Sequence, residues 1–189
     1  RELTPLKLSE GTYWGLDVAE RNGEVVVAGY HRDISTGGSW LDVTSIFTMV
    51  SERPDLSGSW EAPLIVHSDV DVLASQGDPV SVAISENRIH LLFQTSRDDV
   101  TGIERLGVLY THGERGEEGW DFLAAVGDEA SDQHLGIDKD GRLVGIWIER
   151  QGQDAQVCTA VTDEGWSLEE PTCLAAPGAL STSMIEREH

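Results

Sequence analysis

Residues 18–25 read VAERNGEV, residues 82–89 read VAISENRI and residues 136–143 read GIDKDGRL. Each stretch places a short polar turn between two segments of strand character, rich in β-branched or aromatic residues, as in Glu24–Tyr30 and Arg88–Phe93. Asn-Gly and Asp-Gly turns favour tight β-hairpins. No stretch of the sequence keeps the i, i+3, i+4, i+7 apolar spacing of an amphipathic helix over three turns. The sequence therefore predicts an all-β chain built from hairpins.

A second landmark follows each hairpin, at Trp60, Trp120 and Trp166. Between each hairpin and its tryptophan lies a third predicted strand, over residues 40–50, 103–111 and 155–162. Repeated units of four antiparallel strands, about 40–50 residues long, are the blades of β-propellers. We therefore predict an all-β propeller of four-stranded antiparallel blades, in which the three tryptophans wedge between neighbouring blades.

The phase of the repeat predicts where each blade begins and ends. Three complete blades are expected over residues 12–66, 78–127 and 133–175. Residues 1–8 are predicted to be the last strand of a preceding blade, and residues 180–189 the first strand of a following one. Closed propellers have about four to eight blades, and open sheet edges and faces favour association. We expect a partial propeller, whose partner is the remaining blades of the same propeller or a second chain.

The third unit carries the clearest resemblance to a known repeat. Its turn begins at Asp138, its second strand holds Trp147 and Arg150, and residues 162–166 read TDEGW. This unit resembles the Asp-box (bacterial neuraminidase) repeat of sialidase-like propellers, and three tandem units cover nearly the whole chain. The family's box runs Ser/Thr-x-Asp-x-Gly-x-x-Trp, whereas here Gly and Trp are adjacent and the first two units lack the Asp. The resemblance implies a sialidase-like propeller fold and a carbohydrate or protein ligand.

Three arginines hold equivalent places just after the second predicted strand of each unit: Arg32, Arg97 and Arg150. The resemblance implies one role for them, because sialidases grip a substrate carboxylate with three arginines through bidentate hydrogen bonds. The Arg-Ile-Pro-like motif that sialidases place ahead of the first box is absent from this sequence. Each arginine also adjoins an acidic residue, so ion pairs within the loops are the alternative.

The beginnings of the first strands line the axis of a propeller, and they hold a group of aromatic and polar residues: Tyr13, Trp14, Asp78, Ser81 and His134. Such residues around a channel mouth suit a sugar ligand. The alternative is that they plug the channel or pack between blades. A glycosidase also needs two carboxylates roughly 5–10 Å apart. Asp17 and Asp78 carry no local signature of that role, and a solvated rim is the alternative for both.

No metal or cofactor is predicted. The six histidines form no i, i+2 or i, i+4 pair, so zinc is unsupported. Asp69–Asp71 lacks the Gly and later Glu of a calcium loop, and Asp138–Gly141 is better explained as a hairpin turn. The net charge of −21 argues against nucleic acid or an anionic membrane as partner. Neither a Gly-x-Ser-x-Gly elbow nor a glycine-rich phosphate loop is present.

Cys158 and Cys173 are the only cysteines, on the third and fourth predicted strands of the third unit. A regular hairpin centred on Gly165 and Trp166 sets them opposite each other, at Cα separations of about 4.5–5.5 Å that a disulfide can bridge. The alternatives are two buried thiols, or a bulge at Trp166 that turns them to opposite faces. A disulfide predicts an oxidising setting, and therefore a secreted protein, extracellular or periplasmic.

The sequence alone does not distinguish between three functions. The leading hypothesis is a non-catalytic propeller module that binds a ligand or another protein. The rival is a sialidase-like, glycan-acting hydrolase whose catalytic residues lie partly outside this chain. A purely structural scaffold is the third. Whether the protein is an enzyme is therefore undecided by the sequence.

Overall fold

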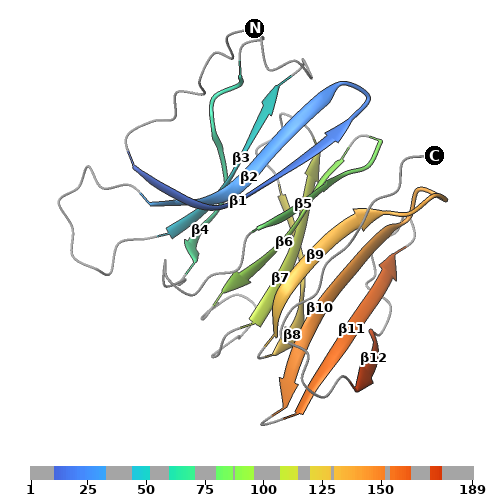
Figure 1. Ribbon diagram of the computed structural model, residues 1–189. Coiled ribbons are helices and arrows are strands. Elements are labelled where there is room, and N and C mark those ends of the chain that lie inside the picture. Colours follow the sequence, from blue (N-terminus) through green and yellow to red (C-terminus); the bar gives the residue numbers. More distant parts are fainter. Residues whose placement is uncertain are drawn as a thin grey trace, which may run out of the picture.

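The computed structural model describes residues 11–32, 44–51, 60–70, 80–86, 88–95, 107–114, 120–128, 130–151, 154–162 and 171–175. Within these ranges it contains twelve β-strands and no helix, and so none that could cross a membrane. The strands form three antiparallel sheets of four strands each (Figure 1). The flanking strands predicted at residues 1–8 and 180–189 lie outside the described ranges.

The three sheets follow one another along the chain. The first contains β1 (Thr12–Arg21), β2 (Glu24–Arg32), β3 (Thr44–Ser51) and β4 (Leu64–Val70). The second contains β5 (Ser81–Ile84), β6 (Arg88–Thr95), β7 (Gly107–Glu114) and β8 (Trp120–Asp128). The third contains β9 (Ala130–Ile137), β10 (Leu143–Gln151), β11 (Asp154–Thr162) and β12 (Thr172–Ala175). Strands adjacent in the chain are adjacent in each sheet, as in propeller blades, and the predicted partial β-propeller is confirmed.

The hairpin turns form where the sequence places them. Asn22 and Gly23 connect β1 to β2 with φ values of 53° and 87°, and Gly23 N–H donates to the Glu20 carboxylate at 2.7 Å. Between β9 and β10, Asp138 Oδ1 accepts the backbone N–H of Asp140 and of Arg142, each at 2.9 Å. The Arg142 guanidinium donates to Asp138 Oδ2 at 2.8 Å. These donors, the Arg142 N–H above all, hold the pKa of Asp138 below its ordinary value.

Two hydrophobic clusters join the sheets face to face. Val26 and Tyr30 of the first sheet pack with Leu91 and Phe93 of the second. On its other face the second sheet packs against the third, where the cluster includes Leu92, Tyr110, Leu135, Trp147 and Cys158. The middle sheet is therefore covered on both faces, and β6 buries every residue after Arg88. Trp120 packs against the first of these clusters, as expected of a wedge between blades.

Hydrogen bonds between the first strands of successive sheets complete these interfaces. Val80 N–H donates to Gly15 O at 2.9 Å, and Val82 N–H donates to Asp17 Oδ2 at 3.0 Å. Leu135 N–H donates to Ser81 Oγ at 2.8 Å. As a result β1, β5 and β9 lie side by side in that order (Figure 1). This arrangement matches the inner strands of a propeller.

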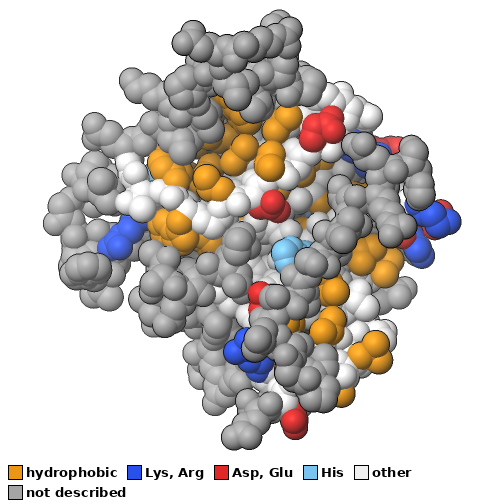
Figure 2. Space-filling view, in the orientation of Figure 1, with side chains coloured by type: hydrophobic (Ala, Val, Ile, Leu, Met, Phe, Trp, Pro, Cys, Tyr) orange, Lys and Arg blue, Asp and Glu red, His pale blue; other side chains and the backbone are white. Residues whose placement is uncertain are grey.

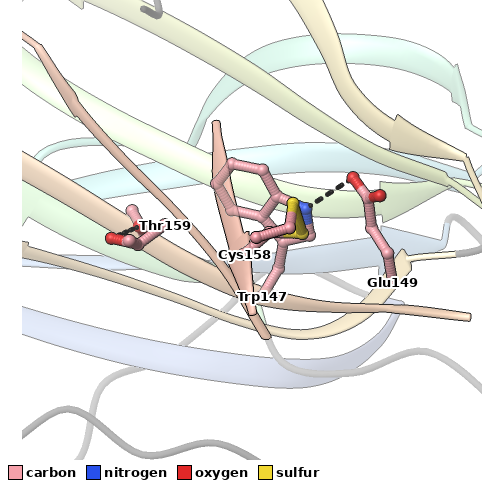
Figure 3. The surroundings of a disulfide bond; sticks show 6 residues. Trp147, Glu149, Cys158 and Thr159 are labelled. Atoms are coloured by element: carbon pink, nitrogen blue, oxygen red, sulfur yellow. Dashed lines mark hydrogen bonds between the residues drawn. A yellow bond between two sulfur atoms is a disulfide. The ribbon is translucent and has the colours of Figure 1, made fainter. Parts of the chain in front are cut away.

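Cys158 and Cys173 are Cα partners on β11 and β12, with no register shift between these strands. A disulfide joins them, with an S–S distance of 2.07 Å and a Cα separation of 4.1 Å. On the neighbouring β10, Trp147 lies opposite Cys158, and its indole N–H donates to Glu149 Oε1 at 3.0 Å (Figure 3). The bridge thus ties the outermost strand of the third sheet to its buried centre.

Candidate functional site at the ends of the first strands

Tyr13 and Trp14 come to the same end of the first sheet but to opposite faces of it. Tyr13 lies 4.6 Å from the His31 ring and meets Phe47 edge-on at 5.2 Å. Trp14 stacks on Tyr30 at 5.6 Å and packs against the cluster between the first two sheets. Side chains alternate along a strand, so this division follows from β geometry. Trp14 is part of the packing between blades, whereas Tyr13 lies on the opposite face of the sheet.

The predicted arginines are distributed over different sheets. Arg32 ends β2 opposite Thr12, close to Tyr13, and is half-buried. Arg150 is exposed on β10, opposite Ala155. The second sheet separates the sheets that carry these two arginines. Arg97 and Asp78 lie outside the described residues, so a three-arginine clamp remains a prediction from the resemblance.

A β-bulge interrupts the first strand of both the first and the third sheet. The register with the neighbouring strand shifts between Trp14 and Asp17 in β1, and opposite Trp147 in β9. Gly15 and Asp132 occupy the same place in these bulges, with left-handed φ values of 57° and 53°. Glycine adopts this conformation freely, and aspartate is among the few other residues that tolerate it. Bulges of this kind are common next to binding sites because they redirect neighbouring side chains.

Asp132 was not anticipated from the sequence. Its conformation becomes recognisable only when β9 is aligned with β1, where a glycine stands at the same place. Ser131 Oγ lies 3.4 Å from Asp132 Oδ2 and donates to it. His134 follows the bulge just as Asp17 follows the bulge of β1, and it is half-buried opposite Ile146. The structure therefore places Asp132 and His134 together at the bulge of β9.

Two ring nitrogens at this end of the first sheet are buried without a hydrogen-bond partner. They are Trp14 Nε1 and His31 Nε2. Buried polar atoms are nearly always hydrogen-bonded in native proteins, so each exception calls for an explanation. Both atoms have almost no accessible surface, and Trp14 lies on the face that packs on the second sheet, so the two nitrogens do not belong to one ligand-binding surface.

A second polar cluster, formed by Ser85, His90, Tyr110 and His112, lies in the second sheet. His90 Nδ1 and Tyr110 OH are 2.8 Å apart, and His90 Nε2 and Ser85 Oγ are also 2.8 Å apart. Burial is the main cause that lowers the pKa of His90 to about 3, with a smaller contribution from His112, 5.9 Å away. Burial also raises the pKa of Tyr110. The buried His90 thus connects Ser85, at the end of β5, to Tyr110 of β7 through its two ring nitrogens.

Glu149, Cys158 and Cys173 bring three potential metal-ligand atoms within 4.8 Å of one another. The two sulfurs are bonded to each other, so neither is a thiolate. The Glu149 carboxylate accepts the Trp147 indole N–H (Figure 3). This group is therefore a disulfide beside a hydrogen-bonded carboxylate and not a metal centre.

No family model matches the chain, and no curated protein matches it. Among solved structures the chain is similar to CoXyl43, a GH43 β-xylosidase/α-arabinofuranosidase from a compost microbial metagenome, solved in complex with xylotriose. The TM-score is 0.57 and the identity is 10%, over 87% of this chain and 59% of that chain. A GH43 enzyme from Xanthomonas citri complexed with xylose gives a TM-score of 0.54 and 13% identity over 88% of this chain and 56% of the other. A Dyadobacter fermentans protein of unknown function gives a TM-score of 0.55 and 12% identity. That match covers 88% of this chain and 41% of the other.

The chain has a β-propeller fold like that of these glycoside hydrolases. At 10–13% identity the likeness shows the fold alone. The chain spans less than two thirds of the length of CoXyl43 and of the Xanthomonas enzyme. The expected resemblance is thus confirmed for the propeller fold of a glycosidase, while the Asp-box repeat itself stays a prediction.

Proposed function

We propose that this chain is a ligand-binding part of a larger β-propeller and that its ligand is a carbohydrate. The observation that carries the proposal is the ring of Tyr13, which lies 4.6 Å from His31 on the face of the first sheet opposite the one that packs on the second sheet. Aromatic rings provide flat apolar surfaces for the C–H faces of a sugar. The half-buried Arg32 lies at the same end but, by strand alternation, on the face that carries Trp14.

The hydrogen bond that Asp17 makes within the fold favours a binding role over hydrolysis. Glycoside hydrolysis requires two carboxylates that face the scissile bond. Asp17 Oδ2 accepts the Val82 backbone N–H at 3.0 Å and so fastens the second sheet to the first. Removing this carboxylate from its partner would leave a part-buried N–H without an acceptor.

The proposal is tested by titrating the 189-residue chain with neutral oligosaccharides in a calorimeter. Xylotriose, which CoXyl43 holds in its structure, is the first probe. We expect saturable binding that Tyr13→Ala weakens by about tenfold, the loss of roughly 1.4 kcal/mol. Trp60→Ala is the matched aromatic control, because Trp60 pairs with Ser51 at the opposite end of the sheet. Binding that Tyr13→Ala leaves unchanged would place the ligand elsewhere.

A glycan-acting hydrolase is the second candidate, and the fold likeness to GH43 enzymes favours it. In that case the catalytic residues belong partly to blades outside this chain. Chromogenic xylosides and arabinofuranosides, offered to the chain together with its remaining blades, distinguish the two. Turnover that survives purification and depends on the added blades would replace binding by hydrolysis as the function.

A further inference from the structure

A cavity of about 240 Å³ lies between the first two sheets, at the end opposite Tyr13. The first sheet lines it with Val50 and Leu64, joined by Glu61 just ahead of β4, and the second sheet lines it with Ile89, Glu114 and Trp120. Thr48 and Ala62 complete the lining, so the walls are apolar except for two carboxylates, one hydroxyl and one indole ring. None of the residues proposed for the site at the end of β1 belongs to this set.

A glycine fixes the position of the Trp120 ring in this cavity. Trp120 lies directly opposite Gly113 across β7 and β8. A Cβ atom at Gly113 would lie 2.7 Å from the ring atom Cδ2 and 2.8 Å from Cε2. The indole therefore lies flat against the backbone of β7, where any larger residue would displace it. The cavity has a preformed aromatic wall, which lowers the entropic cost of binding.

The indole N–H of Trp120 is buried and has no hydrogen-bond partner. Because this atom has almost no accessible surface, a molecule in the cavity would contact the apolar part of the half-buried ring and not its N–H. Glu61 and Glu114 are both exposed, and carboxylates accept hydrogen bonds but do not donate them. The complementary ligand packs an apolar surface on the ring and donates hydrogen bonds to the carboxylates, and a sugar does both. Apolar walls formed by Val50, Leu64 and Ile89 match the C–H surface of a sugar ring.

We propose that this cavity is a second carbohydrate site, which takes a single uncharged sugar residue. Sites for drug-sized ligands measure about 300–1,000 Å³, so a cavity of about 240 Å³ suits one ring and not a chain of rings. Glu61 and Glu114 repel sugars that carry a carboxylate, and the net charge of −21 adds to this repulsion. The site differs in place and residues from the one at the end of β1, so each site can be tested independently of the other.

Heteronuclear NMR of the tryptophan indole N–H groups tests the proposal, with D-xylose and D-glucose as probes and glycerol as the non-ring control. We expect one indole resonance to shift saturably with millimolar sugar but not with glycerol. Trp120→Phe removes that resonance, which assigns it. Tyr13→Ala leaves the shift intact, because it alters only the site at the opposite end. If no Trp120 shift occurs, or glycerol reproduces it, the proposal is wrong.

A second pair of variants measures the role of the carboxylate without disturbing the ring. Glu114→Gln is expected to weaken sugar binding by about tenfold, since a hydrogen bond to a charged carboxylate is stronger than one to a neutral amide. Glu86→Gln, an exposed residue outside the cavity lining, is the matched control and should have no effect. D-glucuronate should bind more weakly than D-glucose to the unaltered chain. Equal affinities for these two sugars would contradict the assigned role of Glu61 and Glu114.

Discussion

Asp17 and Ser81 occupy the same position in consecutive sheets, and each accepts a backbone N–H from the first strand of the next sheet. Asp17 lies opposite Ala28, the fifth residue of β2, and Ser81 lies opposite Leu92, the fifth residue of β6. Their acceptor distances are 3.0 Å and 2.8 Å. The repeated hydrogen bond sets the register between neighbouring sheets. Two different side chains thus perform one structural task.

Asp17→Ala should lower the free energy of unfolding by about 1–3 kcal/mol, because the Val82 N–H would be left part-buried without an acceptor. Asp17→Asn keeps a side-chain carbonyl and should lose less. Urea denaturation followed by tryptophan fluorescence measures both. Ser81→Ala is the parallel variant and should behave like Asp17→Ala. Equal stability of all three variants and the unaltered chain would show that this hydrogen bond is dispensable.

Stability should fall as the pH is lowered from about 6.5 to about 3, because of His90. Its pKa is about 3 in the folded chain and 6.5 when unperturbed, so in this range only the unfolded state takes up the proton. At about 1.36 kcal/mol per pKa unit, the loss is on the order of a few kcal/mol.

His90→Gln removes the titrating group and should flatten the pH profile of stability between these limits. Carboxylates such as Asp138 titrate in both proteins, and their contribution cancels when the two profiles are subtracted. His134→Gln alters a half-buried histidine and is the matched control. A difference profile without slope between pH 6.5 and 3 would mean that His90 is accessible to protons in the folded chain.

Replacing both Cys158 and Cys173 by alanine should cost about 3 kcal/mol of stability, the chain-entropy value for a loop of about 15 residues. Thiol titration of the unaltered chain under denaturing, non-reducing conditions should detect no free thiol. We further propose an extracytoplasmic location, because disulfides persist mainly in oxidising compartments. Two reactive thiols per chain would contradict the bridge and remove this argument for secretion.

Among the described residues, none covers the outer faces of the first and third sheets, and we expect these faces to cause association. Leu16, Val18 and Ile65 of the first sheet are exposed, and Leu174 of β12 is 70% exposed. Hydrophobic side chains reach the surface over both of these sheets (Figure 2). We propose that the remaining blades, or a second chain, cover them. Light scattering of the isolated chain should therefore detect oligomers.

Val18→Lys places a charge on the exposed face of β1 and should reduce this association. Lys139→Glu changes the charge in the turn between β9 and β10 and is the control on a surface without exposed hydrophobic residues nearby. A monomer at high concentration, unaffected by either substitution, would contradict the proposed covering of these faces.

Local signals in the sequence were sufficient for the strands and their order. The Asn22-Gly23 turn and the Asp138 turn each connect two strands as predicted, because a hairpin depends on the conformational preferences of a few consecutive residues. The opposition of Cys158 and Cys173 followed from counting along one hairpin, with no bulge to shift it. Period-two patterning and turn chemistry thus predicted four-stranded sheets arranged along the chain.

Only the tertiary structure decided which side chains meet between sheets. The Trp120 cavity needs walls from two sheets, and nothing near residue 120 in the sequence indicates it. The same holds for the buried His90, whose partner Tyr110 belongs to the cluster between the second and third sheets. The left-handed Asp132 became recognisable only through the bulge that it shares with Gly15. Burial, pKa and cavity shape depend on contacts between residues far apart in the chain, and these leave no periodic pattern in the sequence.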